Sequence, residues 1–295
     1  MKTNKTRIPN TLWTYWESNS PSPPPIVKLC RKSWSTSGRF REVNFLTPTD
    51  LPDYLNDREL PATFHQMPPV KKANAVRLSL LSKYGGHWCD AGVLTTAPVD
   101  AWVAPKATVS GFFVFRDVDK SRILDTWFIS GTPHSEFLAE WRNRYQRFFD
   151  RTRLHEAHSL VKTPSRLATH IIVAINKQLR SSPHKTALWA KYPLSILPMY
   201  PYFVMHYIAN SLLEEPNLRR EFSNMETVKA SRALAMRGVL DANKLTRDAA
   251  HELSRDMPIH KLNTYRTYSS NELSILESLI ECGADPRSCR SCEHH

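Results

Sequence analysis

The chain has 295 residues, of which 41% are hydrophobic and 10% aromatic, and its formal net charge is +12. This apolar content excludes a mainly disordered chain, and five scattered cysteines exclude a disulfide-stapled scaffold and favour a reducing compartment. No apolar run approaches the roughly 20 residues that span a bilayer. Residues 1–7 show no secretory signal, so we predict a cytoplasmic protein. The dispersed positive charge favours an anionic membrane surface or a phosphorylated substrate as partner over specific nucleic acid.

The first half of the chain alternates strands with helices. Strands are predicted over 8–16, 41–46, 87–89, 93–95, 108–115 and 127–130, and helices over 25–34 and 68–84. Pro25 can open the first helix, and Gly85 and Gly86 close the second as a C-cap. This alternation predicts an α/β sheet.

From residue 135 onward the pattern becomes mostly helical. Helices are predicted over 135–151, 165–180, 201–213, 218–237 and 271–281, and the short segment 259–262 is expected to return to the sheet. We therefore predict one domain over 1–285, with a sheet-forming half at 8–131 and a helical half at 132–285. Residues 286–295 are predicted to form a flexible tail.

The strongest chemical signal lies in residues 70–99. A helix ends at Gly85 and Gly86, and a short strand then delivers Asp90 into a turn that contains Gly92. A carboxylate at the end of a strand, beside a glycine that permits close approach, can bind a divalent metal or a sugar hydroxyl. The alternative is a capped helix followed by an ordinary turn aspartate.

Five motifs in order extend this pattern. They are IPNTLWTYWE at 8–17, PPIV at 24–27 followed by Cys30 and Trp34, RL and LL leading into YGGHWCDA at 77–91, WFI at 127–129, and PIHKL at 258–262. Together they resemble the capsular polysaccharide synthesis proteins and the related family 32 glycosyltransferases, which carry a glycine-rich DXD sugar-binding region. The resemblance covers about residues 8–285.

The resemblance implies a GT-A-type fold, with a mixed, mostly parallel sheet flanked by helices and a helical C-terminal half. It also implies a glycosyltransferase, a retaining hexosyl- or pentosyltransferase that moves a sugar from a nucleotide diphospho-sugar to a glycan or lipid-linked acceptor. Residues 8–131 would bind the nucleotide sugar and 132–285 would face the acceptor. Mn²⁺ or Mg²⁺, assisted by Lys or Arg, would stabilise the diphosphate leaving group.

The matching positions receive roles from the resemblance. Asp90 is an expected catalytic residue, and the expected metal ligands are Asp90 and His260. From its position closely before Trp127 and Phe128, Asp125 is a second expected catalytic residue, with a solvated loop as the alternative, and Trp127 is the expected acceptor platform. The expected donor-binding residues are Trp13, Tyr15, Asn74, Arg77, Gly86, Asp90, Gly92, His260 and Lys261. We also expect 260–262 to lie beside the Asp90 turn, because ligands in open α/β sheets bind beyond the carboxyl ends of the strands.

Two positions depart from the family pattern and keep a second function open. Asn74 stands where an aspartate is usual, and Gly92 replaces the second carboxylate of the Asp-x-Asp sequence. Both changes are compatible with a degenerate domain that binds a nucleotide or a glycan without turnover.

Several of these residues also have purely structural interpretations. Trp13 and Trp127 can be core residues, and His260 with Lys261 can be a surface pair. The arginines at 142, 144, 147, 151 and 153 can dock onto an anionic membrane or form a solvated helix face. Cys289 and Cys292, with the final histidines, can bind zinc or belong to a frayed end.

Overall fold

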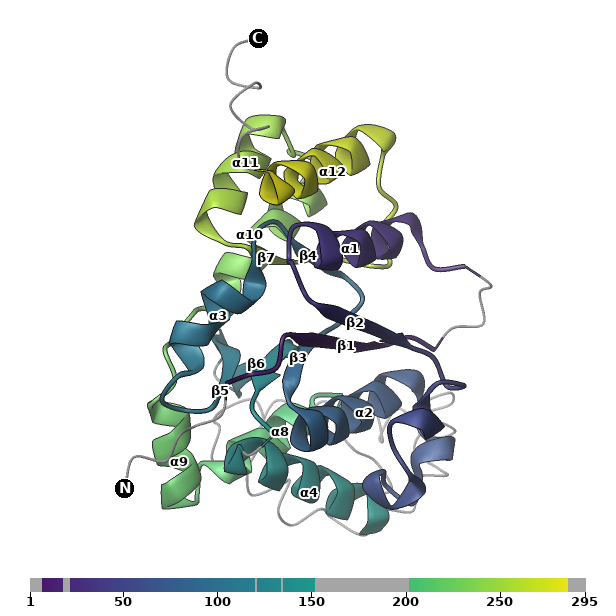
Figure 1. Cartoon of the computed structure of the whole chain (residues 1–295), viewed down its shortest axis with the longest axis vertical. Helices are drawn as coiled ribbons and strands as arrows, with labels where there is room; N and C mark the ends of the chain where they lie inside the picture. The colour runs from purple at the N-terminus through teal and green to yellow at the C-terminus, as the bar shows by residue number, and fades with distance from the viewer. Residues whose placement is uncertain (1–6, 18–21, 120, 134, 152–201, 286–295) are drawn as a thin grey trace, which may run out of the picture.

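A five-stranded sheet forms the centre of the molecule (Figure 1). The computed structural model describes residues 7–17, 22–119, 121–133, 135–151 and 202–285. The strands in spatial order are β2 (Glu42–Leu46), β1 (Thr11–Tyr15), β3 (Gly86–Cys89), β6 (Arg122–Gly131) and β5 (Phe112–Asp119). Because β1 pairs in parallel with β2 and β3, and β6 is antiparallel to both β3 and β5, only β6 runs against the others. The predicted mixed, mostly parallel sheet is confirmed.

Helices cover both faces of this sheet. Figure 1 shows α2 (Pro69–Tyr84), α4 (Glu136–Arg151) and α8 (Val204–Leu212) on one face, with α1 (Pro25–Thr36) and α12 (Ser270–Ala284) on the other. Further elements are α3 (Val99–Ala107), α9 (Pro216–Ser223), α10 (Ala230–Asp241), α11 (Arg247–Asp256) and the short 3₁₀ turns Leu51–Asp53, Asp57–Glu59 and Phe64–Gln66. The predicted helical C-terminal half is therefore confirmed.

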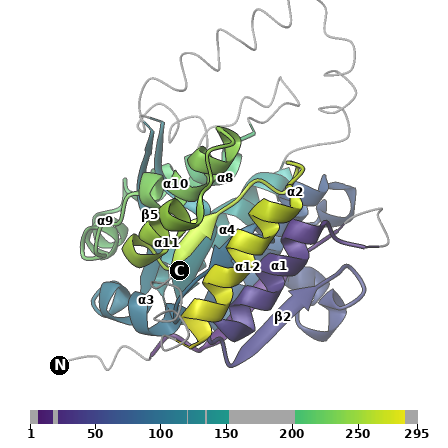
Figure 2. The same ribbon diagram turned by 90° about the horizontal axis from the view of Figure 1, so that it is seen from above.

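The last helix returns to the beginning of the chain. α12 lies alongside α1 when the molecule is seen from above (Figure 2), and Lys32 Nζ lies 2.7 Å from Glu277 Oε1 across this contact. A hydrogen-bonded capping box at Ser269 and Glu272 fixes the start of α12. The amino- and carboxyl-terminal parts of the described chain thus form one layer.

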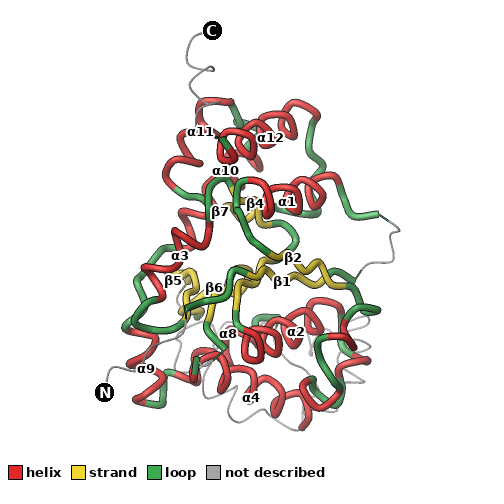
Figure 3. The backbone as a smooth tube through the Cα atoms, in the orientation of Figure 1, coloured by secondary structure: helices red, strands yellow, loops and turns green. Residues whose placement is uncertain are grey.

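A second, two-stranded sheet corrects one expectation. Residues 259–262 do not return to the main sheet. Instead β7 (Ile259–Lys261) pairs antiparallel with β4 (Val93–Thr95), apart from the main sheet (Figure 3). The reason is that β4 follows the Asp90 turn and leaves the main sheet, so its free edge is available to the late segment.

The Gly85–Gly86 pair connects α2 to β3, as predicted. The φ angles of +66° and +95° at these residues favour glycine. A Cβ atom on Gly86 would lie 2.5 Å from the Thr11 carbonyl oxygen, so only glycine lets β3 lie directly beside β1 here. These two residues therefore set the end of α2 and the position of β3 in the sheet.

Some predicted boundaries were wrong. The strand predicted at 108–115 begins only at Phe112, because residues 108–111 close α3, where Gly111 N–H donates to the Ala107 carbonyl. The helix predicted at 218–237 is divided into α9 and α10, because residues between them cross to β5, where Arg116 N–H donates to the Val228 carbonyl. Helices α3 and α11 were not predicted. The helix expected at 165–180 and the candidate zinc cysteines lie outside the described residues.

Candidate functional site

Asp90 directly follows β3, at the carboxyl end of that strand. Its backbone N–H donates to the Trp127 carbonyl at 2.8 Å, which fixes the turn against β6. The indole N–H of Trp88 donates to Asp90 Oδ1 at 3.0 Å, because residues two apart in a strand share one face. The carboxylate is therefore held by its own strand before any other element contacts it.

Two cations from different layers meet at this carboxylate. Arg77 Nη2, on α2, donates to Oδ1 at 2.6 Å, and Lys261 Nζ, on β7, donates to Oδ2 at 3.1 Å. We call Arg77, Asp90 and Lys261 the charged cluster. The Arg77 side chain is only 4% exposed, whereas Lys261 is 18% and Asp90 31% exposed. The cluster is thus closed on the Arg77 side and open to solvent beside Asp90 and Lys261.

The electrostatics of the cluster favour an anionic ligand. Burial raises the pKa of Asp90, but Lys261, Arg77 and the Trp88 hydrogen bond outweigh it, and the net pKa lies below its ordinary value. Burial lowers the pKa of Arg77, and Asp90 opposes that shift. At neutral pH the carboxylate is ionised against two cations, so the cluster carries one net positive charge.

Arg77 is further restrained from the far side. Its guanidinium lies 4.8 Å from the centre of the Trp88 ring, and Nη1 contacts Met205 Sδ on α8 at 3.6 Å. Its Nε atom is buried and has no hydrogen-bond partner within the described part of the chain. The Nε–H group of Arg77 therefore still lacks an acceptor, and the described residues do not supply one.

The expected position of 260–262 beside the Asp90 turn is confirmed. Leu262 N–H donates to the Gly92 carbonyl at 2.7 Å, and Lys261 contacts Asp90 directly. A Cβ atom on Gly92 would lie 2.9 Å from the Leu262 carbonyl oxygen. Gly92 therefore makes room for the chain's own late segment, a role that the sequence did not suggest.

A second polar pair lies at the same edge of the sheet. Asp125 precedes the β6 residues that pair with β3, and its Oδ1 lies 3.6 Å from His206 Nε2 on α8. Thr126 Oγ1 lies 3.4 Å from the same nitrogen. The two side chains are 13% and 10% exposed, and His206 Nδ1 has no partner among the described residues. None of the sequence motifs identifies His206, because its helix carries no family signature.

The pKa shifts of this pair have a common origin. Burial raises the pKa of Asp125, but His206 and the Thr126 N–H outweigh it, so the net pKa lies below its ordinary value. Burial lowers the pKa of His206, and Asp125 only partly opposes this. The pair therefore holds an ionised carboxylate beside a neutral imidazole near neutral pH.

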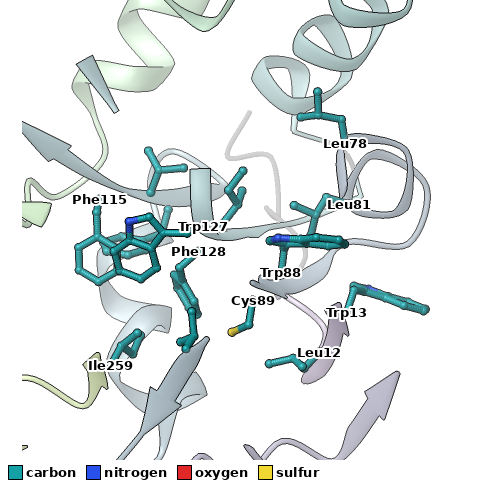
Figure 4. Packing of buried hydrophobic residues seen from close by; sticks show 14 of the residues in the cluster. Leu12, Trp13, Leu78, Leu81, Trp88, Cys89, Phe115, Trp127, Phe128 and Ile259 are labelled. Carbon is teal, nitrogen blue, oxygen red and sulfur yellow. The ribbon is translucent and has the colours of Figure 1, made fainter. Parts of the chain in front are cut away.

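The structure places the three aromatic candidates in the core. Trp13 is 4% exposed and donates to the Gly85 carbonyl, and Tyr15 is 6% exposed and donates to Glu17 Oε2 at 2.7 Å. Trp127 is 5% exposed and stacks on Phe115 with ring centres 4.7 Å apart (Figure 4). None of these rings offers a free face for a base or a sugar, and the packing of the sheet accounts for them.

The remaining predicted residues separate into two groups. Asn74 lies 7% exposed on α2, one turn before Arg77, near the charged cluster. His260 is fully buried, with Nε2 3.5 Å from Thr96 Oγ1, because adjacent residues of β7 point to opposite sides and Lys261 takes the side of Asp90. The structure thus brings Lys261 to Asp90 and keeps His260 in the interior.

The described side chains around Asp90 do not form a metal-binding site of their own. Among the described residues, no three His, Cys, Asp or Glu side chains are grouped as metal ligands. Both Asp90 oxygens accept from cationic groups, and Gly92 contributes no ligand. A divalent cation held by this protein alone does not fit here.

The predicted basic face of α4 is partly neutralised within the protein. Arg144 pairs with Glu140 and Glu215, and Arg147 also contacts Glu140. Arg153 and the side chain of Arg151 lie outside the description. No helix of the described residues is both long enough and apolar enough to cross a membrane.

The fold and the charged cluster define a class: a mixed α/β protein with a cationic site at the carboxyl edge of its sheet. The chain belongs to the capsular polysaccharide synthesis protein family, whose sequence model matches residues 1–280. It is also similar to an O-glycosyltransferase, PaGT, of Phomopsis amygdali, with 25% identity over 155 residues. That match covers 45% of this chain and 37% of PaGT, so the chain spans well under half the length of this relative.

Proposed function

We propose that this protein is a glycosyltransferase that moves a sugar from a nucleotide diphospho-sugar to a glycan or lipid-linked acceptor. The observation that carries the proposal is the charged cluster, a buried Arg77 and a partly exposed Lys261 joined by Asp90 at the ligand-binding edge of an α/β sheet. The family and the similarity to an O-glycosyltransferase support sugar transfer. A GT-A-type arrangement, with the donor at residues 8–131 and the acceptor at 132–285, is part of the same proposal.

Each member of the cluster has a distinct role in this proposal. Lys261 binds the diphosphate and stabilises the negative charge that develops as the sugar–phosphate bond breaks. Arg77 donates hydrogen bonds to the same diphosphate. Asp90 aligns both cations and accepts a hydrogen bond from a hydroxyl of the transferred sugar. Asn74 contributes a further hydrogen bond from α2.

The second polar pair serves the acceptor in this proposal. Asp125 and His206 orient the acceptor hydroxyl at the same sheet edge. We also propose that the transferred sugar is a hexose or a pentose and that its anomeric configuration is retained, as the family resemblance implies. On that course the incoming hydroxyl and the leaving phosphate lie on one face of the sugar, so the phosphate oxygen can take the hydroxyl proton as the new bond forms.

The cellular setting is also a proposal. Cys30 and Cys89 are buried free thiols, which suits a reducing cytoplasm. Peripheral membrane contact would bring the site to a lipid-linked acceptor, and vesicle sedimentation of the purified protein tests it directly.

Lys261→Ala is expected to weaken nucleoside-diphosphate binding by about tenfold or more, because a cationic partner of the phosphates is lost. Binding of the free nucleoside should change little, since it has no phosphate. Calorimetry with both ligands measures the difference. An equal loss for both would instead indicate general destabilisation of the β4–β7 sheet.

Mn²⁺ or Mg²⁺ dependence remains a prediction, and the structure sharpens it. Because both Asp90 oxygens already accept from Arg77 and Lys261, the charged cluster should not hold Mn²⁺ in the free protein, whereas the cluster with bound nucleoside diphosphate should. Transfer should fall in excess EDTA and return with Mn²⁺. Tight Mn²⁺ binding to the free protein, or full activity in EDTA, would contradict this expectation.

A panel of nucleotide sugars tests the function as a whole. A donor that binds the native state raises its melting temperature by mass action, with or without Mn²⁺. Release of nucleoside diphosphate from the same donor then separates an enzyme from a degenerate binding domain. Stabilisation without any turnover, with several acceptors, would favour the binding-only alternative that Asn74 and Gly92 suggest. No stabilisation by any donor would reject the proposal.

A further inference from the structure

A groove on the outside of the molecule is separate from the charged cluster. It lies between α1 and β2, which are neighbours in Figure 2, and has a volume of about 610 Å³. Its lining residues are Pro23, Val27, Lys28, Arg31, Lys32, Ser35, Val43 and Phe45. None of these eight is acidic, so the groove has a cationic wall.

Two of the three cations in this wall have no acidic partner among the residues that the structure describes. Lys28, Arg31 and Lys32 are exposed and share one face of α1, because they are three and four residues apart. Lys32 is paired with Glu277 on α12 at 2.7 Å. In the described ranges, neither Lys28 nor Arg31 has a carboxylate within ion-pair distance. An anion that enters the groove would therefore meet two cations that are free to bind it.

Arg31 is held in an orientation that suits a carboxylate. Its guanidinium lies 4.8 Å from the centre of the Phe45 ring. A guanidinium laid on an aromatic face keeps its N–H edge available, and that edge matches the two oxygens of a carboxylate. Because the side chain is already placed, less conformational entropy is lost when an anion binds.

The floor of the groove is apolar. Val27 is 1% exposed, and Val43 and Phe45 are half-buried against it. An apolar floor beside polar and cationic groups suits a sugar ring, which has an apolar C–H face and a hydroxylated edge. Phe45 is the next-to-last residue of β2, which runs parallel to β1 and β3, so this end of the groove lies toward the sheet edge that carries Asp90.

We propose that this groove binds an acidic glycan, a polymer segment whose carboxylates pair with Arg31 and Lys28 while its rings pack on the apolar floor at Val43, the part that the Arg31 guanidinium does not cover. The inference rests on the proposed function and adds an acidic acceptor as the substrate class. A chain in the groove runs toward the edge where the donor sugar would be transferred.

Two other polyanions fit the groove less well. Single-stranded nucleic acid binds by stacking bases on open aromatic faces, but the Arg31 guanidinium covers the Phe45 ring. Membrane docking needs apolar side chains that project from the surface, whereas Val43 and Phe45 are recessed. Both become outcomes of the test.

The test compares two double variants of equal charge change. Lys28→Glu/Arg31→Glu alters the groove, and Lys244→Glu/Arg247→Glu alters exposed cations at the start of α11 and just before it. The probe is a fluorescent hyaluronan oligosaccharide, with neutral dextran as its uncharged counterpart. We expect the groove variant to bind hyaluronan at least about tenfold more weakly and the matched control to bind as wild type. Dextran should not bind.

Further measurements separate this inference from the proposed function. Nucleoside-diphosphate binding should be unchanged in the groove variant, because neither Lys28 nor Arg31 contacts the charged cluster. The melting temperature should fall only slightly, since the variant loses the exposed contact between Arg31 and Phe45. Equal hyaluronan binding by both double variants and wild type would overturn the inference. The inference would also be overturned if an oligonucleotide or anionic vesicles bound more tightly than hyaluronan and this tighter binding were lost in the groove variant.

Discussion

Asp90→Asn is expected to reduce both sugar transfer and donor hydrolysis more than about tenfold, a loss above ~1.4 kcal/mol at the transition state. The substitution keeps the size of the side chain but removes the charge that aligns Arg77 and Lys261. Initial rates with the donor found in the nucleotide-sugar panel measure the effect. Asp57→Asn, at a side chain that is 97% exposed, is the control and should have wild-type activity.

The same variant should also be less stable. The Arg77 side chain is 4% exposed, and a buried charge without its partner costs up to about 3 kcal/mol, a figure that the partial exposure of Asp90 lowers. Urea unfolding measures this loss, and activity must be compared where the variant remains folded. A folded Asp90→Asn protein with more than about a tenth of wild-type activity would remove Asp90 from the mechanism.

Acid is expected to destabilise the protein strongly between pH 6.5 and 4. Burial lowers the pKa of His87 and of His260 to about 4, from an ordinary value of 6.5. Above pH 6.5 both residues are neutral whether the chain is folded or not. Below it the unfolded chain binds protons that the native state excludes, so the free energy of unfolding falls until about pH 4. Each histidine contributes roughly 3 kcal/mol to this loss.

Urea unfolding at several pH values tests the assignment to these histidines. His260→Met fills the interior without a titrating group, so the dependence of unfolding free energy on pH should become shallower by about one proton across this window. His65→Gln, at a side chain that is 83% exposed, is the control variant. An unchanged slope in His260→Met would show that other groups cause the acid sensitivity.

The local features of the site could be predicted from the sequence because their causes are local. The Gly85–Gly86 pair fixes the end of α2 through its backbone conformation, and the short strand that begins at Gly86 ends at Cys89, directly before Asp90. Apolar spacing and proline positions likewise gave α1 and α2. Boundaries between α9 and α10 could not be predicted this way, because a contact with β5 interrupts the helical segment.

The aromatic and histidine candidates show what a strand pattern leaves open. Alternation separates Lys261 from His260, but it does not reveal which of the two faces Asp90. The same holds for Trp13 and Trp127, whose rings are covered by Tyr54 and Phe115 from other elements. Burial is decided by these distant neighbours, so residue type and spacing gave no reliable guide to it.

The sequence by itself determined the strand–helix alternation, the glycine-capped entry into β3 and the position of Asp90 at a sheet edge. Only the tertiary structure decided that Arg77 and Lys261 share this carboxylate and that His206 lies against Asp125. The physical reason is sequence separation: Lys261 is 171 residues from Asp90, and His206 lies on a helix without a recognisable motif. Such pairs form only when the β4–β7 sheet and the packing of α8 on β6 bring distant segments together.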